Sequence, residues 1–366
     1  MKRILYRIED LLEKPAELPP ASERLEARLP AGGELISVER TLNSRCTSDY
    51  DQNPKRFHWG MFDKTKKLSQ EQLGRIMELT KIPRFTSERL EICAKENILT
   101  FIVDSLTSGI HRDWMMVESG MQQQAAALVC AALGVGMVFS NLGEDGKALS
   151  EDQYATIIIK LDPMKASYNG SFWSSLSPSG WETNLPKNLP DPFRDGNKPL
   201  LATLAHLTIY DKGSKELTDQ SVSQLLWAAK GRTPHFYLSR PWGMTIPTWA
   251  GGQNISTIYL VSKNTLAKYV NWRQNKPAHE LSELRKLDGE LFQNLLETFS
   301  ANQALIVLER NEIFARALWE IGYQLLNLLL QAKALGIFYR ALFLGERQKD
   351  QFRMLGINDP VAIFAL

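Results

Sequence analysis

The chain of 366 residues has few cysteines, almost no net charge and no apolar run long enough to span a membrane. Its three cysteines, Cys46, Cys93 and Cys130, lie far apart and form no CxxC spacing, which argues against a disulfide framework and against a zinc site. The 43 basic and 41 acidic residues leave a net charge of +2 and form no long basic run. A nucleic-acid partner is therefore not indicated.

Targeting signals and common catalytic motifs are missing as well. The first residues, "MKRILYRIEDLLEKPAELPP", are charged throughout and lack the apolar core of a secretory signal. The five histidines show no paired spacing for a metal, and the sequence has no GxxxxGKS or GxxxxGKT, HExxH or GxSxG motif. We expect a soluble protein of the reducing cytoplasm, with no bound metal and no membrane or nucleic-acid partner.

The sequence instead contains one apolar helical stretch twice. Residues 118–136 read "ESGMQQQAAALVCAALGVG", and residues 320–338 read "EIGYQLLNLLLQAKALGIF". Aligned without a gap, the two stretches share identical residues, among them Glu118 with Glu320, Gly120 with Gly322, Gln122 with Gln324, Leu133 with Leu335 and Gly134 with Gly336. This repetition suggests an internal duplication.

Further pairs of segments recur in the same order. Apolar strands are predicted at 99–104 and 304–309 before the two helices, and at 154–161 and 359–366 after them. Amphipathic helices are predicted at 68–79 and 217–228, and similar loops stand at 45–51 and 205–211. Any one pair could be a coincidence between amphipathic segments, but four pairs in one order favour duplication.

The duplication defines the expected domains. The halves span 36–165 and 196–366, joined by a connector at 166–195 rich in Pro, Ser, Asn and Gly and preceded by an arm at 1–35. Small side chains along the repeated helix allow close helix contact, so the halves are expected to pack as an intramolecular pseudo-dimer. A tandem pair of separate domains is the alternative.

Three strings of the second half resemble a known family. "LTDQSVSQLLWAAKG" (217–231), "IPTWAGGQNISTIYLV" (246–261) and "IGYQLLNLLLQAKALGIF" (321–338) are similar to the FMN-dependent nitroreductase superfamily, most of all to its azoline-oxidising dehydrogenases. The resemblance covers the second half well and the first half in outline. It implies an α+β fold of obligate dimers that bind FMN between subunits, here with both subunits in one chain.

The resemblance also implies where the flavin phosphate binds, through a motif of the type Arg-Ser-x-Arg. The first half offers Arg45, Cys46 and Ser48 at these positions, so only the leading arginine is kept. The second half offers Ala205, His206 and Thr208, without an arginine. A solvated loop arginine is the alternative interpretation of Arg45.

A loop that meets the flavin ring is implied at 247–254, "PTWAGGQN". Paired glycines let the backbone approach a flat ring, and the side chains of the loop can bond its polar edge. The first half has only "TKIPRFTSE" at the corresponding place. An ordinary glycine-rich turn is the alternative. The loop residues assigned to the cofactor are Pro247, Thr248, Trp249, Gly251, Gly252, Gln253 and Asn254.

The first half keeps the phosphate arginine but lacks the ring loop, whereas the second half keeps the loop but lacks the arginine. This complementary loss predicts one composite site and one FMN per chain. The expected function is hydride transfer between NAD(P)H and a quinone, nitroaromatic or heterocyclic small molecule. The alternative is a degenerate, flavin-free member that serves as a binding or scaffold partner. The sequence leaves further oligomerisation open. The segment 56–67 is interpreted either as a lid over the site or as an ordinary surface loop. No catalytic residue is assigned; candidates by position alone are His206, Tyr210, Lys230, His235 and Tyr237.

Overall fold

The computed structural model describes residues 35–43, 68–80, 90–95, 98–103, 109–133, 135–140, 157–163, 173–175, 188–233, 235–237, 243–246, 255–273, 276–312 and 315–366. Within this part of the chain the fold combines helices with antiparallel sheets, so the expected mixture of helix and sheet is confirmed. None of the described helices is long and apolar enough to span a membrane.

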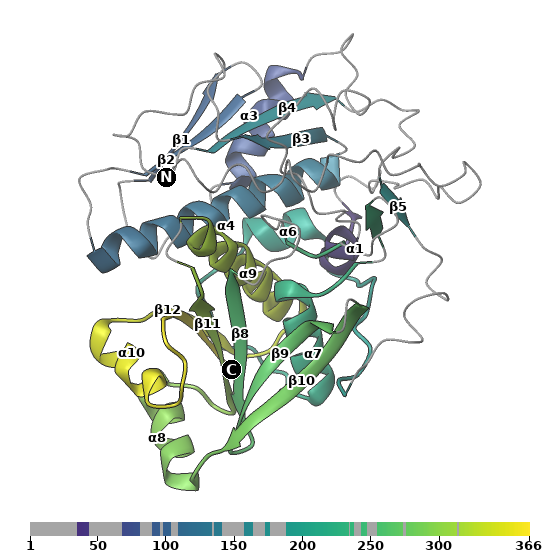
Figure 1. The fold of residues 1–366 in the computed structure, drawn as a ribbon. Coiled ribbons are helices and arrows are strands. Elements are labelled where there is room, and N and C mark those ends of the chain that lie inside the picture. Colours follow the sequence, from purple (N-terminus) through teal and green to yellow (C-terminus); the bar gives the residue numbers. More distant parts are fainter. Residues whose placement is uncertain are drawn as a thin grey trace.

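Two long helices cross in the middle of the molecule, between two sheets (Figure 1). They are α4 (Gly109–Leu133) and α9 (Ala315–Leu335). A Cβ atom added to Gly120 would lie 2.3 Å from the carbonyl oxygen of Trp319, and one added to Gly322 would lie 2.1 Å from that of Val117. Only glycine allows this approach, so the two aligned glycines form the crossing point.

Polar side chains are also buried where these helices meet. Tyr323 donates a hydrogen bond to Gln123 Oε1 over 2.6 Å, and Gln124 Nε2 donates to Asn327 Oδ1 over 3.0 Å. These four residues have no exposed surface. Burial of such groups is tolerated when they are hydrogen-bonded, so these contacts fix the register of α4 against α9.

The smaller sheet lies above α4 in Figure 1 and has the strand order β1-β2-β4-β3, with every pair antiparallel. Its strands are β1 (Leu90–Lys95), β2 (Ile98–Val103), β3 (Val135–Ser140) and β4 (Ile157–Pro163). The helix α3 (Gln70–Thr80) packs against α4 and buries Leu73, Ile76 and Leu79.

The larger sheet has the order β10-β9-β8-β11-β13-β12-β6. Along β8, β11 and β13, side chains that face α9 alternate with side chains that pack under α8 (Gly289–Phe299) and α10 (Glu346–Arg353). Its strands are β6 (Tyr210–Asp211), β8 (Ser256–Ser262), β9 (Thr265–Arg273), β10 (Lys276–Lys286), β11 (Ala304–Arg310), β12 (Tyr339–Phe343) and β13 (Pro360–Ala365).

The two sheets share one arrangement of strands. In the smaller sheet the order is β1-β2-β4-β3, with α4 between β2 and β3 in sequence. In the larger sheet β8-β11-β13-β12 has the same order, with α9 between β11 and β12. The elements β9, β10 and α8 lie between β8 and β11 in sequence, whereas only two residues separate the end of β1 from the start of β2.

Two short helices, α1 (Val38–Asn43) and α6 (Leu200–Ala205), begin side by side. Val38 N donates to Lys198 O over 3.0 Å, and Leu200 N donates to Ile36 O over 2.8 Å. A shift of 162 positions relates Val38 to Leu200 and Ile36 to Lys198, so each segment makes the same contact with the other. Such reciprocity is the geometry of a two-fold axis.

The remaining described elements surround this core. The helix α7 (Asp219–Lys230) begins at Thr218, whose hydroxyl accepts a hydrogen bond from Ser221 N, as expected for an N-cap. The strands β5 (Trp173–Ser175) and β7 (His235–Tyr237) form a separate pair. Helix α9 ends before Gly336, whose φ of +72° favours glycine.

Candidate functional site

The ten residues assigned to the cofactor lie outside the described residues. They are Arg45, Cys46, Ser48, Pro247, Thr248, Trp249, Gly251, Gly252, Gln253 and Asn254, and the segment 56–67 is also outside. The structure does describe the residues that flank both clusters, namely the end of α1 at Asn43, residues 243–246, and β8 with the residue before it.

The segment that leads into 247–254 is fixed by the end of α7. Thr233 N donates to Gly243 O over 3.0 Å, and Thr245 N donates to Gly231 O over 3.1 Å. The carbonyl of Thr245 accepts 3.2 Å hydrogen bonds from Gln124 of α4 and Asn327 of α9. Both central helices therefore hold the entrance to the predicted ring loop.

The segment that follows the loop is held by a buried ion pair. Lys230 Nζ lies 2.6 Å from Glu320 Oε1 and donates to the carbonyl of Ser256 over 2.8 Å. The hydroxyl of Ser256 donates to the same carboxylate oxygen over 2.6 Å and accepts from Gln324 Nε2 over 2.6 Å. Lys230, a candidate by position, thus joins α7, α9 and the start of β8.

Arg194 connects this region with the end of α1. Its Nη1 donates to the carbonyl of Arg232 over 3.0 Å and to Asn43 Oδ1 over 3.4 Å. The guanidinium lies 4.8 Å from the centre of the Trp227 ring, a cation–π contact. Arg232 forms a β-bridge with Met244, which precedes the predicted ring loop, and Asn43 precedes the predicted phosphate residues. Arg194 therefore connects the segments that lead into the two predicted clusters.

Arg232 is a buried cation beside this bridge. It is 5% exposed, its Nε donates to Asn271 O over 3.1 Å, and its guanidinium lies 4.5 Å from the centre of the Trp272 ring. Burial away from water lowers the pKa of Arg232 to about 10. Among the described residues, no carboxylate pairs with it and no acceptor contacts its Nη atoms.

A second buried group lies next to the two arginines. Burial raises the pKa of Tyr269, and the positive charges of Arg194 and Arg232 oppose that rise. Tyr269 Oη and His279 Nδ1 are 2.9 Å apart, and His279 Nε2 is 2.7 Å from Ser223 Oγ. The Ser223 hydroxyl donates to the carbonyl of Pro190, so the chain of hydrogen bonds from Tyr269 through His279 and Ser223 holds the end of the connector. The Ser223 hydroxyl is therefore engaged in a hydrogen bond and is not available as a nucleophile.

The other candidates by position belong to different segments of the fold. His206 follows α6 and is exposed, and Thr208 is exposed and donates to the carbonyl of Tyr210. His235 and Tyr237 belong to β7. In the described part of the chain, no three His, Cys, Asp or Glu side chains could jointly hold a metal ion.

Arg194 and Arg232 are the residues that the sequence pattern did not single out. Arg232 directly follows the helix string "SQLLWAAKG", so its position next to a family-like motif could have identified it as a candidate. Arg194 gives no such signal, because it lies in the connector and meets Asn43 only through the fold.

Comparisons with known proteins give a distant structural resemblance. No protein-family model matches the chain, and no curated protein matches it significantly. A solved structure that does match comes from Ralstonia eutropha JMP134 and is provisionally described as a nitroreductase; it is 19% identical, with a TM-score of 0.37. The match covers 53% of this chain and 96% of the other. Both similarity values are low, so function has to be inferred from this chain's own residues.

Proposed function

We propose that the chain is an FMN-dependent oxidoreductase of the nitroreductase type, with one composite site between its halves 36–165 and 196–366. It would transfer hydride between NAD(P)H and a quinone, nitroaromatic or heterocyclic small molecule. The observation that carries the proposal is the bridge of Arg194, which bonds Asn43 from the first half and the carbonyl of Arg232 from the second.

The bridge limits how far apart the two predicted clusters can lie. Arg45 follows Asn43 by two residues, and Pro247 follows Met244 by three. Since consecutive Cα atoms are about 3.8 Å apart, these residues begin within about 8 Å and 11 Å of their anchors. This limit supports the proposal that phosphate residues from one half and the ring loop from the other share a site.

Reciprocal contacts support the origin of this site from a fused dimer. Gly120 lies against Trp319 while Gly322 lies against Val117, and these partners are all related by the same shift of 202 positions. The pairing of α1 with α6 is reciprocal too. An isologous interface makes each contact twice, and a fused dimer would retain that property.

The residues present suit the phosphate of FMN. A buried guanidinium without a carboxylate is unfavourable unless an anion accompanies it, and the Nη atoms of Arg232 have no acceptor among the described residues. A phosphate matches the paired donors of a guanidinium. When bound, FMN would supply hydride transfer at its ring. The chain would bind the phosphate, orient the ring and exclude water.

One observation favours the alternative, a flavin-free binding partner. Both arginines already form cation–π contacts, Arg194 with Trp227 and Arg232 with Trp272. Cation–π contacts stabilise a buried guanidinium in part, so the fold could persist without phosphate.

Flavin content decides between the two proposals. The purified protein is denatured and the released FMN is counted; about one per chain is expected for a composite site. Two per chain would show that both sites bind flavin and that the site is not unique. A colourless protein that also fails to take up added FMN would leave the flavin-free partner as the better proposal.

Variants of Arg232 test the phosphate assignment. Arg232→Gln should weaken FMN binding at least tenfold while riboflavin, which lacks the phosphate, binds as before. Arg232→Lys keeps the charge and should bind FMN with intermediate affinity. Arg285→Gln, at an exposed position of β10, is the matched control. Equal losses for FMN and riboflavin would place Arg232 away from the phosphate.

A further inference from the structure

A cavity of about 650 Å³ lies at the β12–β6 edge of the larger sheet, whereas Arg232 contacts β9 toward the opposite edge. It is formed by α4, the short strand β6, the strand β12 and the turn after α8. Its volume is in the range of sites for small organic molecules. The residues that line it are Trp114, Ile209, Tyr210, Ser300, Asn302, Phe338, Arg340, Ala341, Leu342 and Phe343.

Aromatic rings form much of the wall. The rings of Trp114 and Phe343 stack with centroids 5.6 Å apart and planes 14° apart. The rings of Tyr210 and Phe338 meet edge to face at 5.9 Å. Trp114 comes from the first half and the other three from the second, so the cavity, like the proposed flavin site, lies between the halves. Such walls suit a flat apolar ring.

Arg340 gives the cavity its charge. It is the only lining residue of the described cavity that is charged at neutral pH, and it is neither ion-paired nor hydrogen-bonded through its side chain to any described residue. Arg340 lies opposite Tyr210 in the β12–β6 ladder, so their side chains share one face of the sheet. The exposed side chains of Ser300 and Asn302 add hydrogen-bonding groups beside it.

We infer that this cavity binds a planar aromatic carboxylate. Aromatic walls would hold the ring, and the guanidinium of Arg340 would hold the carboxylate through two parallel hydrogen bonds. A single arginine suits a monoanion better than a phosphate dianion. The neighbouring segment 205–211 adds no arginine or lysine, and its His206 follows α6 at an exposed position.

Calorimetric titration with 2-naphthoate and its neutral isostere 2-naphthamide tests this site. The wild-type protein should bind naphthoate at least tenfold more tightly than naphthamide, because only the carboxylate forms charge-assisted hydrogen bonds. Arg340→Gln should remove that preference, and Trp114→Leu should weaken both ligands. Arg285→Gln, exposed on β10, should behave as wild type. Equal binding of both ligands to the wild type, or an unchanged preference in Arg340→Gln, would overturn the inference.

Binding of naphthoate in this cavity has to be distinguished from binding of flavin. The inference does not depend on the proposed FMN site, so naphthoate should bind equally well to protein that contains no flavin. Arg340→Gln should retain the flavin content of the wild type, since Arg340 is not part of the Arg194–Arg232 bridge. Displacement of naphthoate by added FMN would instead identify the cavity as a second flavin site and would overturn the assignment.

Discussion

Lys230 Nζ lies 2.6 Å from Glu320 Oε1 at a point where the glutamate side chain has no exposed area (0%) and the lysine has 7%. The pair fixes the end of α7 to α9, and Ser256 joins both. Removing one partner of a buried pair leaves the other charge uncompensated, which costs more than the pair itself contributes.

Glu320→Gln is therefore expected to lower the free energy of unfolding by about 3–5 kcal/mol, because Lys230 keeps its charge without a carboxylate. The double variant Lys230→Met with Glu320→Gln should recover part of that loss. Urea unfolding at neutral pH measures both. Glu297→Gln, on the exposed side of α8, is the control. A loss below about 1 kcal/mol in Glu320→Gln would contradict the buried pairing.

The crossing of α4 and α9 predicts opposite effects for two glycine substitutions. Gly120→Ala should destabilise the protein by about 1–3 kcal/mol or more, because the new methyl group meets the backbone of Trp319. Gly74→Ala, exposed in α3 with nothing within 4 Å, should stabilise by about 0.5–1 kcal/mol, since alanine favours helix. Thermal unfolding compares the two. A neutral Gly120→Ala would mean that the helices pack less closely.

If the crossing is two-fold, Gly322→Ala should resemble Gly120→Ala. The double variant should cost less than the sum of the single variants, because one separation of the helices relieves both contacts. Additive losses would argue against a shared crossing point.

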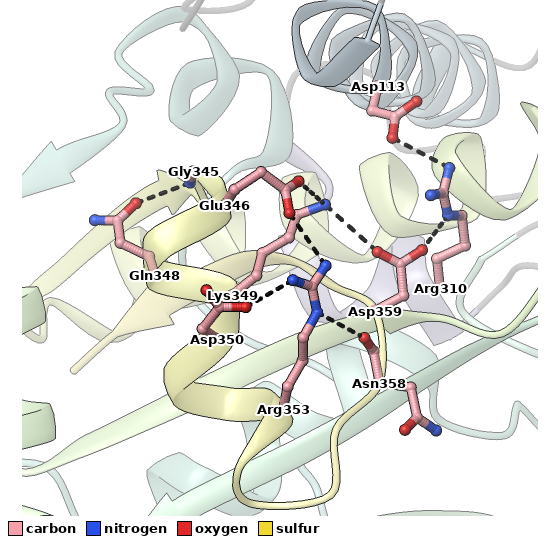
Figure 2. Close-up of polar contacts among 10 residues, drawn as sticks. All are labelled: Asp113, Arg310, Gly345, Glu346, Gln348, Lys349, Asp350, Arg353, Asn358 and Asp359. Atoms are coloured by element: carbon pink, nitrogen blue, oxygen red, sulfur yellow. Dashed lines mark hydrogen bonds and ion pairs between the residues drawn. The ribbon is translucent and has the colours of Figure 1, made fainter.

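A cluster of ion pairs joins α4 to the larger sheet and is shown in Figure 2. Arg310 Nη1 lies 3.2 Å from Asp113 Oδ2 and its Nε lies 2.6 Å from Asp359 Oδ2, while Lys349 Nζ lies 3.4 Å from the other oxygen of Asp359. Arg353 pairs with Glu346 and Asp350 on the outer side of α10, at greater exposure.

Asp359→Asn should therefore destabilise by about 1–3 kcal/mol, because it weakens two partly buried pairs at once. Arg353→Gln should change stability by less than about 1 kcal/mol, since exposed pairs contribute little. Thermal unfolding at low and high salt measures both, and only the small effect of Arg353→Gln should disappear in salt. Equal effects would mean that Asp359 is hydrated.

A pH dependence follows from Asp211 and Lys333, which lie 2.5 Å apart at the end of β6. The hydrogen bond from Lys333 lowers the pKa of Asp211 below 3.8, and the hydrogen bond to Asp211 raises the pKa of Lys333 above 10.5. The contribution is thus complete at neutral pH, is lost as pH falls through the folded pKa of Asp211, and is lost again as pH rises through that of Lys333.

Lys333→Met should lower the free energy of unfolding by less than about 1 kcal/mol at pH 7, because both groups are nearly one-third exposed. The difference from wild type should shrink as pH falls below 3.8. Urea unfolding across pH provides the measurement, with Lys286→Met, exposed at the end of β10, as the control. A difference that persists unchanged at low pH would assign it to packing of the lysine stem.

Local pattern predicted many elements but not all of their limits. The strand expected at 304–309 is β11, and the helix expected at 217–228 is α7, shifted by two residues. The helix expected from residue 118 begins at Gly109, because His111, Arg112 and Asp113 hide the apolar pattern of its first turns. The insertion of β9, β10 and α8 into the second half was not anticipated, since a repeat search detects what two segments share.

The sequence by itself determined the central helices, the small residues at their crossing and the strands β2, β4, β11 and β13, because these depend on the pattern of apolar side chains along the chain. Only the tertiary structure decided which distant groups meet. Arg194 contacts Asn43 across 151 positions, and Gln331 donates to Glu39 across 292. Such contacts leave no local period in the sequence, since they depend on how the helices and sheets pack in three dimensions.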